Sequence, residues 1–475
     1  MTESVRAARS AVTLGSALAV TSVIALAVRL LLPRLLGPEA FGQLRLAESF
    51  AEMLFVVLTL GVDQHLRQHA AIDPTGARRY LTGLSVWRLG LAVLTTLAGA
   101  WVLRLTGAAG EVVAIFVALA VAQTCLVLNN SLAAYEQAAG DVAWLARTNF
   151  GVKVVWAGVV LATVVELRSG LAVAIAGAIV EAGRFAWMLS RGLTRHGFGR
   201  RPDLRLAGTA IVTSLPFFVH LLAHSLYARL GVGWLGAVGT DVEVGLFGAA
   251  ATFAGVALLG MPLLTWVLVP SAARADAQGD LDGLVAGALR TSLLMAVPVA
   301  FLFHLLAADL LGVAFGDSFR PAAATLQLLS PTFALAYVST VCAIVLLQRG
   351  RVRLVAGISL GGLVLTAAID AIAIPRLMAE GAALATLLTE VVVTAVLAYS
   401  ARLPWSRHQL GRTAVALVAA SLAGVATHTL WPSFLPAALF TFVAVLVASG
   451  GVSRDDAGFV HRVLVRRVPA ASEVA

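Results

Sequence analysis

Charged residues are scarce in this sequence, and cysteines are rarer still. Only 12% of the 475 residues are Asp, Glu, Lys or Arg, whereas a soluble globular domain carries roughly 25%. Once its apolar segments are set aside, the chain has almost no sequence left for a soluble domain. The two cysteines, Cys125 and Cys342, both fall inside apolar segments. This placement excludes a disulfide framework, and the pair matches no metal-ligand spacing.

The sequence also lacks the motifs of enzymes. It has no glycine-rich phosphate loop, no nucleophile paired with a base and no polar domain that would hold an active site. The net charge of +9 arises in short loops between apolar segments and not in a basic domain. Arginines placed in this way fit membrane topology and attraction to anionic lipid at the cytoplasmic face. We therefore expect no enzyme, no cofactor, no metal site and no nucleic-acid partner.

The sequence instead contains apolar segments of about 20 residues from end to end. A helix of about that length spans the hydrocarbon core of a bilayer. The segments are continuously apolar and do not alternate, which indicates helices and not barrel strands. We predict an all-α polytopic membrane protein with about 14 transmembrane helices. The expected spans are 11–32, 44–63, 82–103, 112–134, 145–165, 170–189, 209–232, 244–269, 285–308, 323–347, 353–374, 382–400, 411–429 and 433–450.

Arginine is concentrated in every second loop, and this pattern fixes the direction of each span. With the N-terminus in the cytoplasm, the cytoplasmic segments hold roughly three arginines for each one in the outer loops. We therefore expect a multi-pass protein of the bacterial plasma membrane with both termini in the cytoplasm. The first apolar run continues past Leu31 without a cleavage site, so we expect a first span and not a signal peptide.

The longest polar linker carries five arginines and is expected in the cytoplasm. It separates the first six expected spans from the last eight. We predict an N-terminal lobe over residues 1–190, the linker over 191–206, a C-terminal lobe over 207–401, and two extra helices with a cytoplasmic tail over 402–475. Two bundles joined in this way can move against each other, as transporter repeats do.

A sequence pattern near the start of the first lobe recurs near the start of the second. Residues 36–42 read Leu-Gly-Pro-Glu-Ala-Phe-Gly, and residues 235–248 contain Leu-Gly, then an acidic residue, then Phe-Gly. Both segments are expected on the outer side, which predicts a parallel pseudo-twofold repeat. The alternative is chance, because Leu-Gly and Phe-Gly are common in apolar chains.

Three cations lie inside the expected spans at a similar depth. Arg88, Lys153 (the only lysine in the chain) and Arg184 lie six to eight residues from the cytoplasmic ends of their spans. At 1.5 Å per residue, each lies roughly 8–12 Å inside the membrane, where a charge costs about 2.5–3.5 kcal/mol. We predict a basic chamber that binds an anion such as phosphate. In the alternative, Arg184 pairs with Glu181, and Arg88 and Lys153 reach the inner headgroups.

Further ionisable residues lie nearer the outer face or in the second lobe. Arg29 is late in the first span, and Glu48 and Glu52 lie one turn apart early in the second. They form either a structural Arg–carboxylate pair or a proton or sodium site that governs closure. Glu390 lies near the middle of the twelfth span and is the best single candidate for ion coupling. Asp370 lies near an outer end, where it is expected to meet water.

The stretch from Arg29 to Leu66 resembles the opening of the polysaccharide-biosynthesis flippases of the multidrug/oligosaccharidyl-lipid/polysaccharide exporter superfamily. That family's pattern is a first helix ending in Leu-Gly-Pro-x-x-Phe-Gly and a second ending in Leu-Gly, which this chain has at 36–42 and 60–61. The resemblance extends over residues 12–400. Similar segments occur at Leu215-Pro216, Val244 to Ala250, Val269-Pro270, Phe315-Gly316 and Glu380 to Thr386. Arg229 departs from the family pattern, which often has a polar or acidic residue there.

The resemblance implies two six-helix lobes around a central cavity that opens alternately to each face. It also implies a cargo, a glycan on polyprenyl diphosphate that is carried from the cytoplasmic to the outer leaflet. The diphosphate site at Arg88, Lys153 and Arg184 is predicted from depth and charge and not from a family motif. The implied partners are this lipid-linked glycan, membrane lipid, a coupling H+ or Na+, and a polysaccharide polymerase or another assembly protein.

Three alternative functions remain open on the sequence. A lipid II flippase shares the fold and also uses a cationic cavity. A drug/cation antiporter of the same superfamily would need an acidic cavity, and the deep charges of the first lobe are mostly basic. A non-transporting scaffold of envelope assembly would not depend on the three buried cations.

Overall fold

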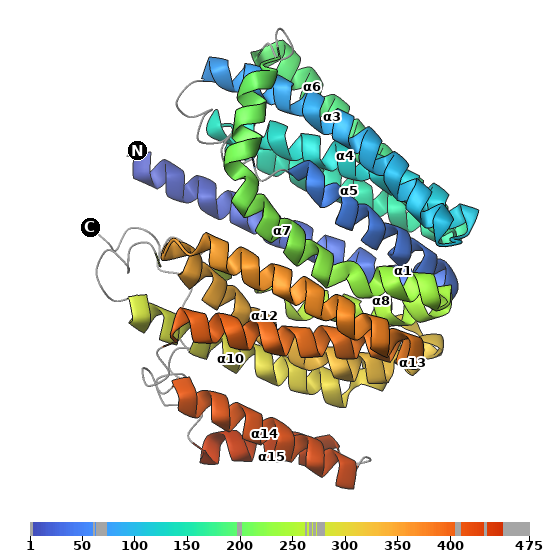
Figure 1. The fold of residues 1–475 in the computed structure, drawn as a ribbon, viewed down its shortest axis with the longest axis vertical. Coiled ribbons are helices and arrows are strands. Elements are labelled where there is room, and N and C mark those ends of the chain that lie inside the picture. The colour runs from blue at the N-terminus through green and yellow to red at the C-terminus, as the bar shows by residue number, and fades with distance from the viewer. Residues whose placement is uncertain are drawn as a thin grey trace. The chain divides into compact units, whose positions relative to one another are not determined.

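The computed structural model describes residues 3–59, 62, 74–196, 202–261, 264–265, 268, 272, 281–403, 410–431 and 435–449. Every long element in these ranges is a helix (Figure 1). The first half contains α1 (Glu3–Thr59), α3 (Pro74–Leu105), α4 (Gly110–Ala138), α5 (Val142–Leu167), α6 (Gly170–Arg191), the short π-helix η1 (Gly192–His196), α7 (Leu204–Val238) and α8 (Asp241–Ala257). The second half contains α10 (Leu281–Leu305), α11 (Ala307–Phe315), the 3-10 helix η2 (Asp317–Ala322), α12 (Ala323–Gln348), α13 (Val352–Ala401), α14 (Leu410–Leu430) and α15 (Leu435–Ala448).

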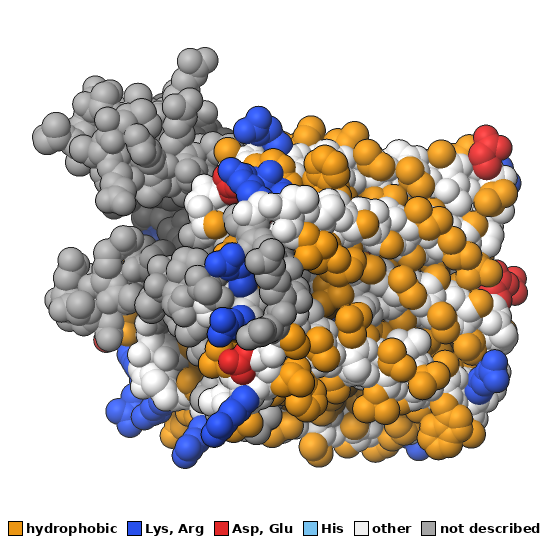
Figure 2. Space-filling view, turned by 90° about the horizontal axis from the view of Figure 1, so that it is seen from above, with side chains coloured by type: hydrophobic (Ala, Val, Ile, Leu, Met, Phe, Trp, Pro, Cys, Tyr) orange, Lys and Arg blue, Asp and Glu red, His pale blue; other side chains and the backbone are white. Residues whose placement is uncertain are grey.

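The helices confirm an all-α protein that crosses a membrane many times. Within the described residues, nine helices are long and apolar enough to span a bilayer, and α15 is a shorter apolar helix. Of the nine, Val20–Thr59 overlaps the first two expected spans, and Val352–Ala401 contains the eleventh and twelfth. Figure 2 shows hydrophobic side chains over most of the visible described surface, with charged side chains gathered towards the helix ends. This distribution suits a lipid environment.

Breaks in α1 and α13 separate the expected spans there. Gly37 interrupts α1 with φ 78° and ψ 171°, which confirms the predicted Leu-Gly helix end. The break in α13 falls on Met378, with φ 48° and ψ −122°, although Gly381 is close by. Gly381 is needed for packing, because a Cβ there would lie 2.5 Å from the Ala373 carbonyl oxygen. A non-glycine residue in such a conformation costs about 1–3 kcal/mol.

Several helices begin at a side-chain cap. Ser169, Asp203 and Thr240 accept hydrogen bonds from backbone amides at the starts of α6, α7 and α8. The short helices α11 and η2 occupy residues that the sequence assigned to the end of one span and to a loop. Apart from these two and η1, which lies in the predicted linker, the described elements follow the expected order of spans.

The chain forms two compact units. The first comprises Met1–Leu259, Ala307–Leu329 and Arg351–Val393, and the second comprises Gly260–Leu306, Ser330–Gly350 and Thr394–Ala475. The first unit includes α7 and α8 because both pack against α1. The predicted lobes are defined by relative motion and not by packing, so their boundary at residues 191–206 stays a prediction.

In the first unit, α1 lies among α3, α4, α5, α6, α7 and α8 (Figure 1). A buried cluster joins α3 to the helices around it through Tyr80, Leu84 and Tyr135. Helices α1 and α8 approach each other closely, because glycines let their backbones come into contact. A Cβ on Gly42 would lie 1.7 Å from the Asp241 carbonyl oxygen. Small residues commonly permit such close crossings in membranes.

In the second unit, α14 and α15 pack on α10. The rings of Phe301 and Phe442 stack with centroids 4.4 Å apart. Gly424 makes room for this stack, since a Cβ there would lie 2.3 Å from Phe301 Cζ. The two helices that the sequence placed after the C-terminal lobe are therefore joined to α10 by a hydrophobic core that includes this pair of stacked rings.

Candidate functional site

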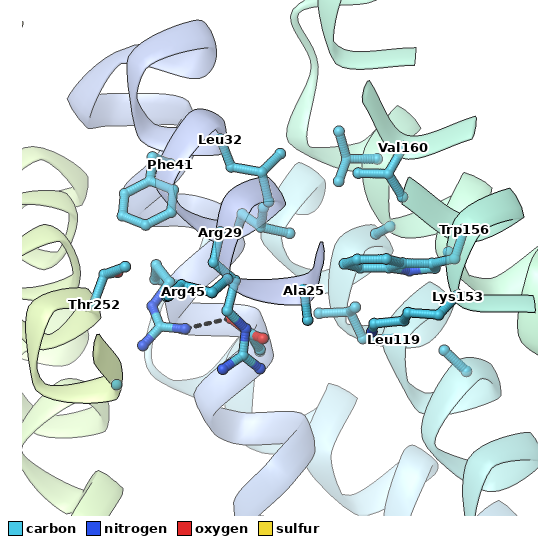
Figure 3. A pocket seen from close by; sticks show the side chains of 18 of the residues that line it. Ala25, Arg29, Leu32, Phe41, Arg45, Leu119, Lys153, Trp156, Val160 and Thr252 are labelled. Atoms are coloured by element: carbon cyan, nitrogen blue, oxygen red, sulfur yellow. Dashed lines mark hydrogen bonds and ion pairs between the residues drawn. The ribbon is translucent and has the colours of Figure 1, made fainter. Parts of the chain in front are cut away.

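A cavity of about 460 Å³ lies within the first unit (Figure 3). Side chains from α1, α4, α5, α6 and α8 line it, and most of them are apolar. The charged residues among the lining are Arg29, Arg45, Glu48, Lys153 and Glu181. A volume of this size falls within the range of pockets that hold small ligands.

The α1 side of the cavity carries two arginines and one glutamate. Arg45 Nη1 donates a hydrogen bond to Glu48 Oε2 at 2.5 Å, and each side chain is 25% exposed. The Arg45 stem packs on α8, because a Cβ on Gly248 would lie 2.9 Å from Arg45 Cγ. Arg29 lies beside this pair (Figure 3). Among the described residues, no carboxylate is hydrogen-bonded to Arg29.

The α5 and α6 side carries Lys153, Trp156 and Glu181. Lys153 Nζ lies 3.8 Å from the centroid of the Trp156 ring, a cation–π contact. In the described part of the chain, this amine has no hydrogen-bonded acceptor. Glu181 Oε2 accepts a hydrogen bond from Asn129 Nδ2 at 3.2 Å. Lys153 is therefore the cation on this wall that remains open to an anion from outside the protein.

Arg184 lies behind Glu181 and is absent from the cavity lining. Its Nη1 is 3.5 Å from Glu181 Oε2, and its Nη2 donates to Asn149 Oδ1 at 2.8 Å. The pairing of Arg184 with Glu181, which the sequence offered as an alternative to anion binding, is thus present. Arg184 orients a residue of the cavity wall without facing the cavity itself.

Arg88 lies elsewhere in the first unit and is fully buried. Its Nη1 donates to Ser131 Oγ, and its Nη2 donates to the Thr59 carbonyl oxygen at 2.8 Å. Thr59 is the last residue of α1, where backbone carbonyls favour a cation. Because Arg88 is buried, it does not reach the headgroups. Of the three predicted cations, Lys153 is the one that lines the cavity.

Glu52 forms an ion pair with Arg229, whereas Glu48 forms one with Arg45. Arg229 Nε of α7 donates to Glu52 Oε2 at 2.6 Å, and Arg229 Nη2 forms an ion pair with the same oxygen at 2.5 Å. Arg229 Nη1 also donates to Ser225 Oγ at 3.2 Å. The departure from the family pattern at position 229 thus supplies a two-point contact between α7 and α1. Sequence reasoning missed both Arg45 and Arg229 as partners of these glutamates.

Two carboxylates of α13 face α7. Tyr227 Oη donates to Glu390 Oε2 at 3.1 Å. Asp370 is fully buried, which corrects the expectation that it meets water. Within the described residues, neither of its oxygens has a hydrogen-bond partner. A Cβ on Gly231, one turn after Tyr227, would lie 3.6 Å from each Asp370 oxygen.

Comparison with known proteins settles the family. The sequence profile described as "Polysaccharide biosynthesis protein" matches residues 7–276, more than half of the chain. The chain belongs to this family. No curated protein matches the sequence. Every residue that lines the cavity lies inside the matched region.

Solved structures show which fold this family member has. The lipid II flippase MurJ in an inward closed conformation is 11% identical, with a TM-score of 0.70 over 96% of this chain and 100% of that chain. A multidrug resistance MATE family transporter of the MOP superfamily, inward-facing, is 16% identical, with a TM-score of 0.66 over 80% of this chain and 94% of that one. A MOP superfamily transporter from Pyrococcus furiosus is 14% identical, with a TM-score of 0.57 over 84% of this chain and 94% of that one. The chain therefore has the fold of MOP-superfamily transporters.

Proposed function

We propose that this protein flips a polyprenyl-diphosphate-linked oligosaccharide from the cytoplasmic to the outer leaflet by alternating access, for polysaccharide biosynthesis. One observation carries the proposal. Arg29 and Lys153 line a cavity between transmembrane helices, and in the described part of the chain neither is hydrogen-bonded to a carboxylate. The family supports a role in polysaccharide biosynthesis, and the fold supports transport.

The charge of the cavity favours an anionic cargo. Three cations line it, Arg29, Arg45 and Lys153, against the two carboxylates Glu48 and Glu181. Each carboxylate is already held by an arginine of the protein. A diphosphate offers many acceptor oxygens and pairs strongly with guanidinium and ammonium groups. A drug/cation antiporter would need the opposite balance.

The physics of the cargo explains why such a cavity is needed. Moving charged phosphates and sugar hydroxyls through hydrocarbon unaided is prohibitive, since each unpaired polar group costs several kcal/mol. A cavity lined by cations replaces the lost hydration of the phosphates. The polyprenyl tail is as apolar as lipid and can stay in the bilayer.

The three predicted cations take different parts in this proposal. Lys153 binds the diphosphate directly, and Arg29 replaces Arg88 as its partner. Arg184 acts through Glu181, whose carboxylate it holds. Arg88 acts on the fold, through Ser131 and the end of α1.

We propose roles in closure and in ion coupling for the remaining carboxylates, Glu52 and Glu390. The Arg229–Glu52 contact joins α7 to α1, so we propose that it helps to keep the two helices together in this state. We assign coupling to H+ or Na+ to Glu390, because Tyr227 gives it a neutral hydrogen-bond donor and no cation. Such a flippase would work in the bacterial plasma membrane, with both termini in the cytoplasm and a polymerase or another assembly protein nearby.

The test is transport by a double variant, Arg29→Ala with Lys153→Ala. In proteoliposomes loaded with a fluorescent polyprenyl-diphosphate glycan, we expect flipping to fall at least about tenfold because two cavity cations are lost. Arg104→Ala, at an exposed site at the end of α3, is the matched control. Unchanged flipping by the double variant would refute the anion site, whereas no flipping by the wild-type protein itself would favour a scaffold role.

A lipid II flippase is the second candidate, supported by the likeness to MurJ over nearly the whole chain. Both cargoes carry a polyprenyl diphosphate, so the cavity cations do not separate them. The same proteoliposomes loaded with lipid II provide the comparison. Faster flipping of lipid II than of the glycan would favour this candidate.

A further inference from the structure

The cavity contains a third cation, Arg45, whose charged end is occupied by a residue of the same helix. Glu48 follows Arg45 by three positions, so the two side chains lie on one face of α1. Arg45 Nη1 lies 2.5 Å from Glu48 Oε2, and both residues line the cavity. Arg29 and Lys153 are open to an incoming anion, but Arg45 is not.

Glu48 lies in an unusually positive environment for a carboxylate inside a membrane protein. Arg45, Arg29 and Arg229 are its electrostatic neighbours. Glu52, one turn further along α1, is held by Arg229 instead. Glu52 also acts on Arg45 electrostatically, but Glu48 is the carboxylate that is hydrogen-bonded to Arg45.

We propose that Glu48 substitutes for the phosphate when the cavity is empty and releases Arg45 when the diphosphate binds. This inference rests on the proposed function. Carboxylate and phosphate oxygens are equivalent partners for a guanidinium group. An arginine without a partner among transmembrane helices is costly. With Glu48 present, Arg45 is paired both before and after the exchange.

The packing of Arg45 explains why Glu48 is the side chain that moves. The Arg45 stem is confined by α8, because a Cβ on Gly248 would lie 2.9 Å from Arg45 Cγ and 3.2 Å from Nε. The guanidinium group therefore stays in the cavity wall. Glu48 has its own flexible stem and faces the cavity, so it can turn away when a phosphate takes its place.

The exchange also explains how the cargo leaves. A transporter must bind well enough to accept its cargo and weakly enough to release it, as conduction through a pore requires of each site. Competition from Glu48 lowers the affinity for the diphosphate and returns Arg45 to its pair after release. Removing the carboxylate should therefore tighten binding and slow release.

The experiment compares binding of two probes, inorganic pyrophosphate and farnesyl diphosphate, to the full-length protein in lipid nanodiscs. Glu48→Gln keeps the shape of the side chain and removes its charge. We expect it to bind both probes about tenfold more tightly, because one nearby negative charge is lost. Glu166→Gln is the matched control, since Glu166 is exposed on α5 and does not line the cavity. Arg29→Ala and Lys153→Ala should each weaken binding.

The outcomes separate this inference from the proposed function. If Glu48→Gln binds no more tightly than the wild type while Arg29→Ala and Lys153→Ala weaken binding, the exchange is refuted and the anion site stands. If Glu166→Gln tightens binding as much as Glu48→Gln, the effect is general electrostatics and the exchange is refuted. If Arg29→Ala and Lys153→Ala bind like the wild type, or if neither the wild type nor any variant binds either probe, the anion site itself fails. Tighter binding with slower flipping in Glu48→Gln supports the exchange.

Discussion

Gly42 of α1 and Gly245 of α8 each lie against the backbone of the other helix in a reciprocal arrangement. A Cβ on Gly42 would lie 1.7 Å from the carbonyl oxygen of Asp241, four residues before Gly245. A Cβ on Gly245 would lie 2.0 Å from the carbonyl oxygen of Pro38, four residues before Gly42. The crossing of α1 and α8 therefore depends on one glycine from each helix, and both glycines lie in the segments that resemble each other in sequence.

Replacing either glycine should disturb this crossing. We expect Gly42→Ala to lower the melting temperature and to favour a state in which α1 and α8 are apart, since the methyl group would overlap backbone atoms. Overpacking of this kind costs about 1–3 kcal/mol. Thermal unfolding in detergent and cysteine accessibility along α8 are the measurements. Gly90→Ala is the control, because a Cβ there has no atom within 4 Å, and equal melting temperatures for the two variants would contradict the prediction.

Arg88 should affect stability more than transport chemistry. Replacing it with alanine removes the donors to Ser131 and Thr59 and leaves a hole among buried helices. We expect a loss of about 2–4 kcal/mol and reduced abundance in the membrane. The surviving protein should bind pyrophosphate as the wild type does. Normal abundance with lost binding would show instead that Arg88 contacts the anion.

Asp370 is a buried carboxyl group with no hydrogen-bond partner among the described residues. We expect Asp370→Asn to raise the melting temperature by about 1–3 °C in sodium-free buffer, because a buried unpaired charge is removed. Thermal unfolding of both proteins, with and without sodium, is the measurement. A lower melting temperature in the variant, with sodium stabilising the wild type alone, would show that this carboxylate holds a cation.

The aromatic stack in the second unit should decide whether α14 and α15 stay on α10. Phe442→Ala removes one ring of a pair whose centroids are 4.4 Å apart. We expect a loss of about 3–5 kcal/mol and earlier proteolysis near residue 430. Phe440→Ala provides the comparison, because Phe440 is 75% exposed on the same helix. Similar proteolysis of both variants would mean that the stack contributes little.

The lengths of the apolar segments and their low charge were enough to predict the spans. The thickness of the hydrocarbon core sets the length of a span, and its apolar interior disfavours charged residues. The conformation of Met378 was not predictable from local sequence, since Gly381 nearby is the residue that usually adopts positive φ. The short helix α11 was also not predicted. Its nine residues are mostly apolar but too few to span a membrane, and such segments look like the end of a neighbouring span.

The candidate site was only partly predictable. The sequence placed Lys153 within an expected span, and the structure places it in the cavity lining, but position along a helix does not specify which face of the helix meets a cavity. The sequence therefore did not distinguish Arg88 from Lys153, although Arg88 is absent from the cavity lining. The Arg45–Glu48 pair could have been found from its spacing of three residues. The Arg229–Glu52 pair could not, because the two residues are 177 positions apart.

Lys153 is a native site for selective chemical labelling. It is the only lysine in 475 residues, and it lines the cavity. Amine-reactive acylating reagents therefore have a single side-chain target in the whole chain, besides the terminal α-amino group. Added to one side of a sealed vesicle, a membrane-impermeant reagent would report which face the cavity opens to, with no engineered cysteine and no change to the native sequence.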